Sequence, residues 1–131
     1  MKSGPSLNTP RSSHGCERVD DRLIIVAGGR DNDLLVSTEV LEIGDRKWIK
    51  GPNLKERVNG NRLVFSNRKD YMVYSIGGNT GHWKYLSKIY GFKRDINEWQ
   101  LIDNMNEPRA YGSALNVPLN MLPWCWSYDS Y

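Results

Sequence analysis

The chain lacks any long hydrophobic run. Its longest apolar stretch is Leu23–Ala27, whereas a membrane-spanning helix needs about 20 apolar residues. Met1–Ser6 carries a lysine but no apolar core behind it, so no secretory signal is predicted. Blocks of like charge are missing too, because the 18 Lys and Arg and the 15 Asp and Glu are spread along the 131 residues. We therefore expect a cytoplasmic chain that binds neither membranes nor nucleic acid.

Cysteine and histidine are scarce, with 2 of each in the chain. Cys16 and Cys125 show no CxxC spacing and are expected to stay reduced. His14 and His82 stand alone in their segments, so no metal site is predicted. The polar Arg30–Asp33 loop lacks the glycine and the distant glutamate of a calcium-binding EF-hand loop. Nucleotide-binding, nucleophile and paired-carboxylate motifs are also missing, so we expect neither an enzyme nor a cofactor.

What the chain does have is an internal repeat of about fifty residues. An apolar run ends in two glycines, a second apolar strand follows, then a lone tryptophan, and then an arginine with a glycine three residues on. The paired landmarks are Gly28-Gly29 with Gly77-Gly78, Trp48 with Trp99, and Arg57 with Arg109. A period of this size indicates stacked supersecondary units.

The segments between the landmarks predict short strands and tight turns. Leu23–Ala27 is continuously apolar, and Val40–Ile43 and Ile89–Phe92 mix β-branched, aliphatic and aromatic residues. Four such strands per repeat predict an all-β fold of four-stranded antiparallel meanders. Connections in a meander alternate between its two ends. The loops after the glycine pairs and the segments leading into the arginines are therefore expected to share one face.

The repeat resembles kelch repeats, in which a strand ending in Gly-Gly is followed by an aromatic strand, a tryptophan and Pro-Arg. The match extends from about residue 7 to residue 117, because Pro10-Arg11 begins an earlier cycle. The resemblance implies a partial β-propeller of four-stranded kelch blades that is not closed within this chain. The expected divisions are an N-terminal segment over 1–9, a first blade over 10–55, a second blade over 56–106, the first strand of an incomplete third blade over 107–117, and an off-pattern tail over 118–131.

The pattern breaks in the third repeat. A third glycine pair would fall near position 129, where the sequence reads Tyr128-Asp129-Ser130. Propellers close with roughly four to eight blades, so two blades leave two flanks unpaired. We expect such flanks to favour self-association. A truncated product without a function of its own is the alternative that this break leaves open.

The landmark residues are expected to be structural. Glycine takes positive φ freely where neighbouring blades crowd, and tryptophan offers a large apolar surface to bury between blades. The structural set is Gly28, Gly29, Trp48, Gly77, Gly78, Tyr90 and Trp99.

The loops are expected to carry a partner-binding face. Arginines at the start of each first strand suit bidentate contacts with acidic groups, with hydrogen bonding inside the blade as the structural alternative. Trp83 lies among polar loop residues, where partner contact and local packing are both open. The predicted face consists of Arg11, Arg30, Asp31, Asn32, Asp33, Arg57, Asn79, Thr80, His82, Trp83, Lys84, Tyr85 and Arg109.

The resemblance implies a protein–protein interaction module. Kelch-like proteins typically use the propeller face to capture substrates for cullin-based ubiquitin ligases and carry BTB and BACK domains upstream of the propeller. Those domains are not visible in this sequence, so the resemblance implies substrate capture only. Actin-binding kelch proteins are the nearest alternative. Kelch copper oxidases need several Tyr, His and Cys ligands from different blades, and 2 histidines argue against that activity. The expected partner is therefore a protein, either a ligase substrate or a cytoskeletal component.

Overall fold

Two four-stranded antiparallel sheets make up the fold. The computed structural model describes residues 3–67 and 69–113, and no helix occurs among them, so no membrane-spanning helix is found there. Each sheet is a meander whose strands follow sequence order. The first sheet holds β1 (Gly15–Val19), β2 (Leu23–Ala27), β3 (Thr38–Glu42) and β4 (Ile49–Lys50). The second holds β5 (Arg62–Phe65), β6 (Val73–Ile76), β7 (Lys88–Lys93) and β8 (Glu98–Asn104). The predicted all-β fold of open, partial propeller type is confirmed.

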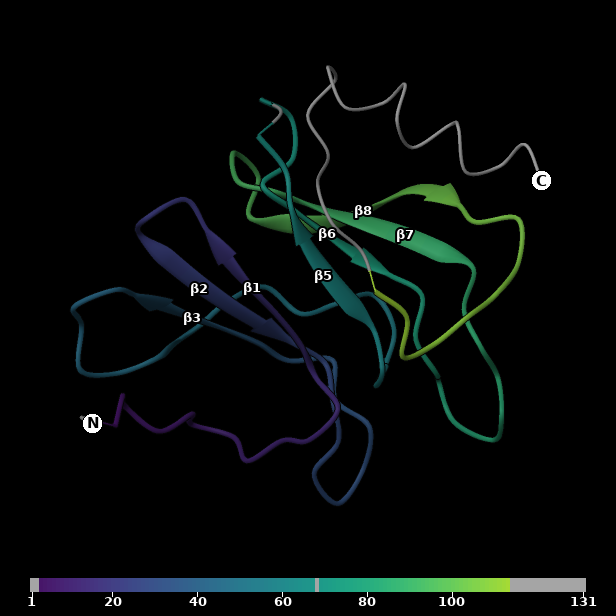
Figure 1. Cartoon of the computed structure of the whole chain (residues 1–131), viewed down its shortest axis with the longest axis horizontal. Coiled ribbons are helices and arrows are strands. Elements are labelled where there is room, and N and C mark those ends of the chain that lie inside the picture. Colours follow the sequence, from purple (N-terminus) through teal and green to yellow (C-terminus); the bar gives the residue numbers. More distant parts are fainter. Residues whose placement is uncertain (1–2, 68, 114–131) are drawn as a thin grey trace.

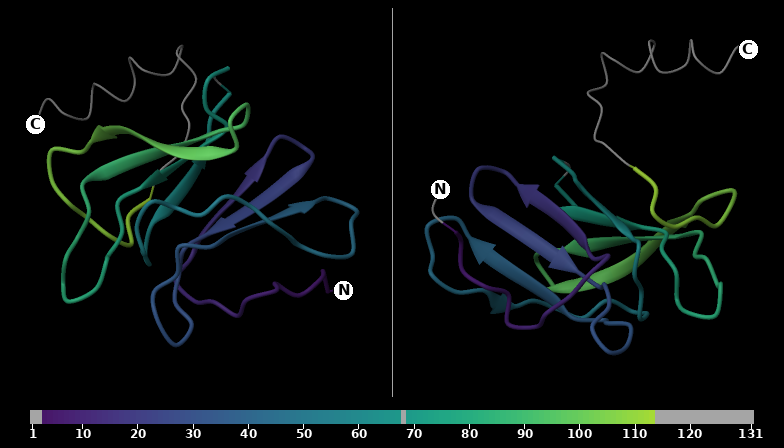
Figure 2. Two further views of the ribbon diagram at one scale, coloured as in Figure 1. Left: turned by 180° about the vertical axis from the view of Figure 1, so that it is seen from behind. Right: turned by 60° about the horizontal axis from the view of Figure 1, so that its bottom comes forward.

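The sheets lie side by side, with β1 of the first sheet against β5 of the second (Figures 1 and 2). One buried apolar cluster joins them. Leu54 and Val58 enter that cluster from the connection between the sheets, so the connection is part of the core. The buried members are Val19, Ile25, Ala27, Leu54, Val58, Leu63, Val73, Tyr90, Phe92 and Trp99. Burial of this cluster is what holds the two sheets together.

The repeated tryptophans bind the segments that lead into the sheets. We call residues 5–13 and 52–60 the lead-in segments, since each precedes the first strand of a sheet. The indole N–H of Trp48 donates to the carbonyl of Pro5 at 3.0 Å, and that of Trp99 to the carbonyl of Pro52 at 3.2 Å. The tryptophan therefore anchors the lead-in segment of its own sheet in both repeats.

Backbone hydrogen bonds between the repeats fix their register. The N–H of Gly60 donates to the carbonyl of Ser13 at 2.7 Å, and the N–H of Tyr111 donates to that of Gly60 at 2.8 Å. These three residues share a left-handed backbone, with φ of 52°, 65° and 57° for Ser13, Gly60 and Tyr111. They are therefore equivalent positions in three successive repeats.

This register corrects the arginine landmark. The carbonyl of Val58 accepts from Gly29 N–H at 2.7 Å, and the carbonyl of Arg109 accepts in the same way from Gly78 N–H at 2.9 Å. Val58, not Arg57, is thus the structural equivalent of Arg109. Pairing two arginines by identity shifted the alignment by one residue, and a shift of one residue in extended chain turns a side chain to the opposite side.

Residues 105–113 contain no strand among those that the structure describes. The later part of the strand predicted over 107–117, from residue 114, and the tail predicted over 118–131 lie outside the described residues.

The first glycine of each pair lets the next repeat approach closely, and the second lets the lead-in segment of its own sheet approach. Gly78 has a φ of 116°, and a Cβ built on it would collide with the Val58 side chain. Gly44, in the β3–β4 turn, has a similar φ of 107° but open space around it. We expect Gly44→Ala to cost about 1–3 kcal/mol through backbone strain alone, and Gly78→Ala to cost clearly more. Urea denaturation of both variants measures this, and equal losses would contradict the steric role of Gly78.

Candidate partner-binding groove

The loops predicted to form a binding face do lie at one end of the two sheets. The connections after the glycine pairs, over residues 30–37 and 79–87, point toward the lower edge of Figure 1. The second lead-in segment and Tyr111 come to the same end, because Asn59 pairs with Asn79 and Tyr111 is bonded to Gly60. The meander topology accounts for this, because every second connection of an antiparallel meander lies at the same end of its sheet.

An open groove of about 630 Å³ runs between these loops. Eight of its lining residues were predicted from the sequence. They are Arg30, Asp33, Arg57, Asn79, Thr80, His82, Trp83 and Tyr85. Four more were not, namely Leu34, Asn59, Gly81 and Tyr111. The groove therefore draws on the first sheet's loop, the second sheet's loop and the segments leading into the second and third repeats.

Arg57 fastens the first sheet's loop to the second lead-in segment. Its guanidinium donates to the carbonyl of Leu34 at 2.8 Å and lies 3.9 Å from the carboxylate of Asp33. Both side chains are well exposed, so the ion pair contributes about 1 kcal/mol at most. Arg57 is thus occupied within the groove wall, whereas the guanidinium of Arg30 has no partner among the described residues.

A strained hairpin tip forms the second sheet's side of the groove. Asn79 pairs with Tyr85, and the N–H of Lys84 donates to the carbonyl of Gly81 at 2.9 Å. The central residues His82 and Trp83 have φ of 48° and 62°, as in a type I′ turn. Such turns favour Asn and Gly, and a bulky residue in this conformation costs roughly 1–2 kcal/mol. Strain of this kind concentrates at functional sites.

Three aromatic side chains in the groove are open to solvent. Trp83 is 83% exposed, Tyr111 64% and Tyr85 43%. The hydroxyl of Tyr111 accepts a hydrogen bond from the Asn59 amide at 3.3 Å, and its ring covers Gly60, where a Cβ would stand only 3.0 Å from ring atoms. Large exposed aromatics that gather on one face are typical of protein contact surfaces.

Arg11 is a correction to the predicted face. Its side chain is 0% exposed, and its guanidinium donates to the carbonyls of Gly28 and Ser37, each at 2.9 Å, and to the carboxylate of Glu39 at 2.7 Å. Arg11 therefore has the structural role given above as the alternative, because its guanidinium makes its hydrogen bonds inside the blade. A guanidinium held in this way cannot reach a partner.

Four other predicted residues lie near the groove without lining it. They are exposed, on the loops or on the segment leading into the third repeat. Arg109 contributes its backbone to the contact with Gly78, and its side chain faces solvent. The four residues are Asp31, Asn32, Lys84 and Arg109.

A buried hydroxyl and a carboxylate connect the second lead-in segment to β7. The Tyr90 hydroxyl donates to Glu56 at 2.6 Å, and the Lys88 ammonium donates to the other oxygen at 3.0 Å. Burial and the adjacent carboxylate raise the pKa of Tyr90 well above its usual value. Burial alone would raise the pKa of Glu56, but the hydrogen bonds from Tyr90 and Lys88 outweigh it and lower that pKa. At neutral pH the Glu56 carboxyl group is therefore ionised and the Tyr90 hydroxyl is protonated, so the cluster keeps its hydrogen bonds.

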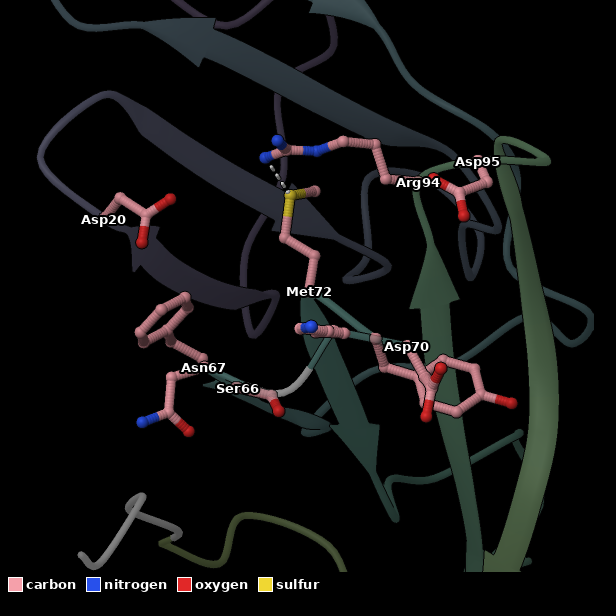
Figure 3. A pocket seen from close by; sticks show the side chains of 10 residues that line it. Asp20, Ser66, Asn67, Asp70, Met72, Arg94 and Asp95 are labelled. Carbon is pink, nitrogen blue, oxygen red and sulfur yellow. Dashed lines mark hydrogen bonds between the residues drawn. The ribbon is translucent and has the colours of Figure 1, made fainter.

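A second hollow, of about 380 Å³, opens at the opposite end of the sheets. Figure 3 shows its charged lining, in which the guanidinium of Arg94 reaches the Met72 sulfur at 2.8 Å. Asp20, Asp70 and Asp95 line it as well. No residue of the predicted face lies there, and no group of three metal-ligand side chains occurs within 3–67 and 69–113. The loop groove is therefore the candidate site.

Comparison with known proteins finds relatives that carry kelch repeats. No family model matches the chain. Kelch-like protein 41a of Danio rerio is 27% identical over 112 residues, covering 84% of this chain and 18% of that protein. Kelch repeat-containing protein kel-10 of Caenorhabditis elegans is 24% identical over 114 residues, covering 84% and 19%. A kelch repeat and BTB domain-containing protein of the same worm is 25% identical over 114 residues, again covering 84% and 19%.

The chain spans less than a fifth of the length of these relatives. Over the part of the chain that the relatives cover, the fifty-residue repeat and the two four-stranded sheets also indicate kelch repeats. The chain is similar to kelch-repeat proteins over 84% of its length.

Proposed function

We propose that this chain supplies a protein-binding face, formed by the loops that surround the groove. Kelch-repeat relatives support a protein-interaction module in general. The observation that carries the proposal is the meeting of Trp83, Tyr85 and Tyr111, all exposed, in one groove between successive repeats. Aromatic side chains of this kind provide most of the binding energy in many protein interfaces.

The experiment is capture of partners by the purified chain, followed by mass spectrometry. A groove variant, Trp83→Ala with Arg30→Glu, is compared with a control, Ile43→Ala with Arg46→Glu, which changes an exposed apolar residue and an exposed arginine in the β3–β4 turn. We expect proteins captured by the wild type to be lost from the groove variant and kept by the control. Equal capture by all three chains would contradict a binding face at the groove.

More specifically, we propose that the face belongs to a substrate-capturing part of a cullin-based ubiquitin ligase adaptor. The support is the resemblance to kelch-like proteins and the BTB domain in the name of one relative. An isolated capturing part competes with the complete adaptor for substrate. Proteins bound through the groove should therefore become more abundant in cells that express this chain in excess. Unchanged abundance would contradict the adaptor role and leave the binding role intact.

We also propose that the chain contributes blades over 10–55 and 56–106, with a third beginning at 107. The support is the backbone register, because Arg109 and Tyr111 bond to the second repeat as Val58 and Gly60 bond to the first. The flank of the second blade would then be covered by whatever continues from this start, or by a second copy of the chain.

A further inference from the structure

The groove offers hydrogen-bond donors that nothing in the described chain uses. Side-chain donors without a partner among residues 3–67 and 69–113 include the Arg30 guanidinium, the Trp83 indole N–H, the Tyr85 hydroxyl and the Asn79 amide N–H. Each can donate to an acceptor on a ligand. The groove therefore suits a ligand that supplies acceptors.

Three side-chain acceptors of the groove are already in use. One oxygen of Asp33 accepts from the N–H of Leu34 at 2.7 Å, and the other faces Arg57. The oxygen of Tyr111 accepts from Asn59, and that of the Asn79 side chain accepts from Gly81 N–H at 2.7 Å. A ligand that approaches Asp33, Tyr111 or Asn79 therefore meets an acceptor that already has a donor.

The charge of the lining is close to balanced. Arg57 is held by Leu34 and Asp33, so Arg30 is the remaining arginine of the lining whose guanidinium is free among the described residues. One free cation beside a carboxylate gives little net attraction for a partner with several negative charges. A ligand of low charge fits this lining better than a strongly acidic one.

The aromatic rings stand apart and open. The ring pairs among the described residues are Tyr71 with Tyr74 and Phe92 with Trp99, none of them in the groove. The rings of Trp83, Tyr85 and Tyr111 thus have no ring partner in the described chain, and Tyr111 covers Gly60 with its ring. Separated aromatic walls with donors between them are the arrangement that recognises proline-rich segments in a polyproline II conformation.

We propose that the groove binds a proline-rich segment of a partner protein in the polyproline II conformation. This rests on the proposed function and adds the chemistry of the partner. Proline has no N–H to donate, and the carbonyls of a polyproline II helix make no internal hydrogen bonds, so they match the free donors. The pyrrolidine rings pack against the aromatic side chains, and the stiff conformation keeps the entropy loss on binding small.

We expect Trp83, which the strained turn exposes, to contribute the largest share of the binding free energy. Its left-handed backbone and 83% exposure mean that the turn holds the indole out from the sheet without burying it. Trp83→Gly should relieve the backbone while removing a wall of the groove. We therefore expect this variant to melt at the same or a higher temperature than the wild type and yet to bind at least about tenfold more weakly. A purely structural tryptophan would show the reverse.

The test is a titration of the full 131-residue chain with labelled decaproline. A Gly-Ser peptide and a glutamate-rich peptide of equal length are the comparison probes. Binding is followed by fluorescence anisotropy and by the indole N–H resonance of Trp83, assigned from the Trp83→Phe variant. Asn97→Gly is the matched control, because Asn97 also has a left-handed backbone, with φ of 51°, but lies in the β7–β8 turn.

We expect decaproline to bind, to shift the Trp83 resonance and to bind Asn97→Gly as it binds the wild type. Equal binding of the Gly-Ser peptide, tighter binding of the acidic peptide, wild-type affinity in Trp83→Gly, or no binding of decaproline would each overturn the inference. In the last case, groove-dependent capture of partners would still support the proposed function, so the two failures are distinguishable.

Discussion

Trp99→Ala is expected to destabilise the chain by about 3–5 kcal/mol. The Trp99 side chain is 0% exposed, lies 5.5 Å from the ring of Phe92 and donates to the carbonyl of Pro52. Its removal leaves a cavity between the sheets and an unbonded carbonyl in the lead-in segment. A domain of this size has a total stability of about 5–15 kcal/mol, so the variant should be largely or partly unfolded at 25 °C. Urea denaturation followed by circular dichroism measures the loss.

Trp48→Ala is the matched control, since Trp48 is the same landmark one repeat earlier. It makes the same hydrogen bond, to Pro5, but its ring is only half-buried and no earlier repeat packs against it in the described chain. We expect a smaller loss, of about 1–2 kcal/mol. Trp99→Phe should fall between the two, because it keeps most of the apolar contact and loses the N–H. Equal losses for Trp48→Ala and Trp99→Ala would show that packing between repeats does not determine how much stability the tryptophan contributes.

The strands could be predicted because their signals are local. Leu23–Ala27 was predicted as a buried strand, and β2 has those bounds. Val40–Ile43 and Ile89–Phe92 were located to within two residues of β3 and β7. When a run of apolar residues ends in Gly-Gly, both ends of the strand can be located from the local sequence. The short β4, with both residues exposed, is defined mainly by pairing with β3, so its extent could not be read from its own sequence.

The register between repeats could not be predicted in the same way. Arg57 and Arg109 match by identity and by the glycine three residues on, and the structure nevertheless aligns Val58 with Arg109. Ser13, Gly60 and Tyr111 have different side chains, and only their shared positive φ and their hydrogen bonds reveal the equivalence. Backbone conformation is conserved here where side-chain identity is not.

This register also explains which groove residues the sequence missed. Asn59 and Tyr111 reach the groove because successive repeats are bonded to one another, which is a non-local contact. The one sequence signal for Tyr111 is an aromatic residue two positions after the arginine of the Pro-Arg motif. Arg11 was assigned to the face for the opposite reason, since its position is correct for the motif and its burial depends on Glu39 from β3.

Glu39→Ala is expected to cost about 3–5 kcal/mol, the second large effect. Glu39 is 4% exposed at its side chain and accepts from the guanidinium of Arg11 and from the backbone N–H groups of Asn8 and Thr9. Without the carboxylate, the charge of Arg11 is buried and unpaired, and the first lead-in segment loses its attachment to β3. Limited proteolysis should then cut this segment faster, and urea denaturation gives the loss of stability.

Two comparisons separate the buried charge from the glutamate itself. Glu42 is on the same strand and pairs with Arg22 at 3.5 Å, with both side chains more than half exposed, so Glu42→Ala should cost less than about 1 kcal/mol. The double variant Arg11→Met with Glu39→Met removes both charges and keeps the volume. It should recover most of the stability that Glu39→Ala loses, because desolvating the ion pair offsets much of its attraction. A double variant as unstable as Glu39→Ala would mean that the hydrogen bonds of the two side chains, rather than the unpaired charge of Arg11, account for the loss. Those bonds join Glu39 to Asn8 and Thr9, and Arg11 to Gly28 and Ser37.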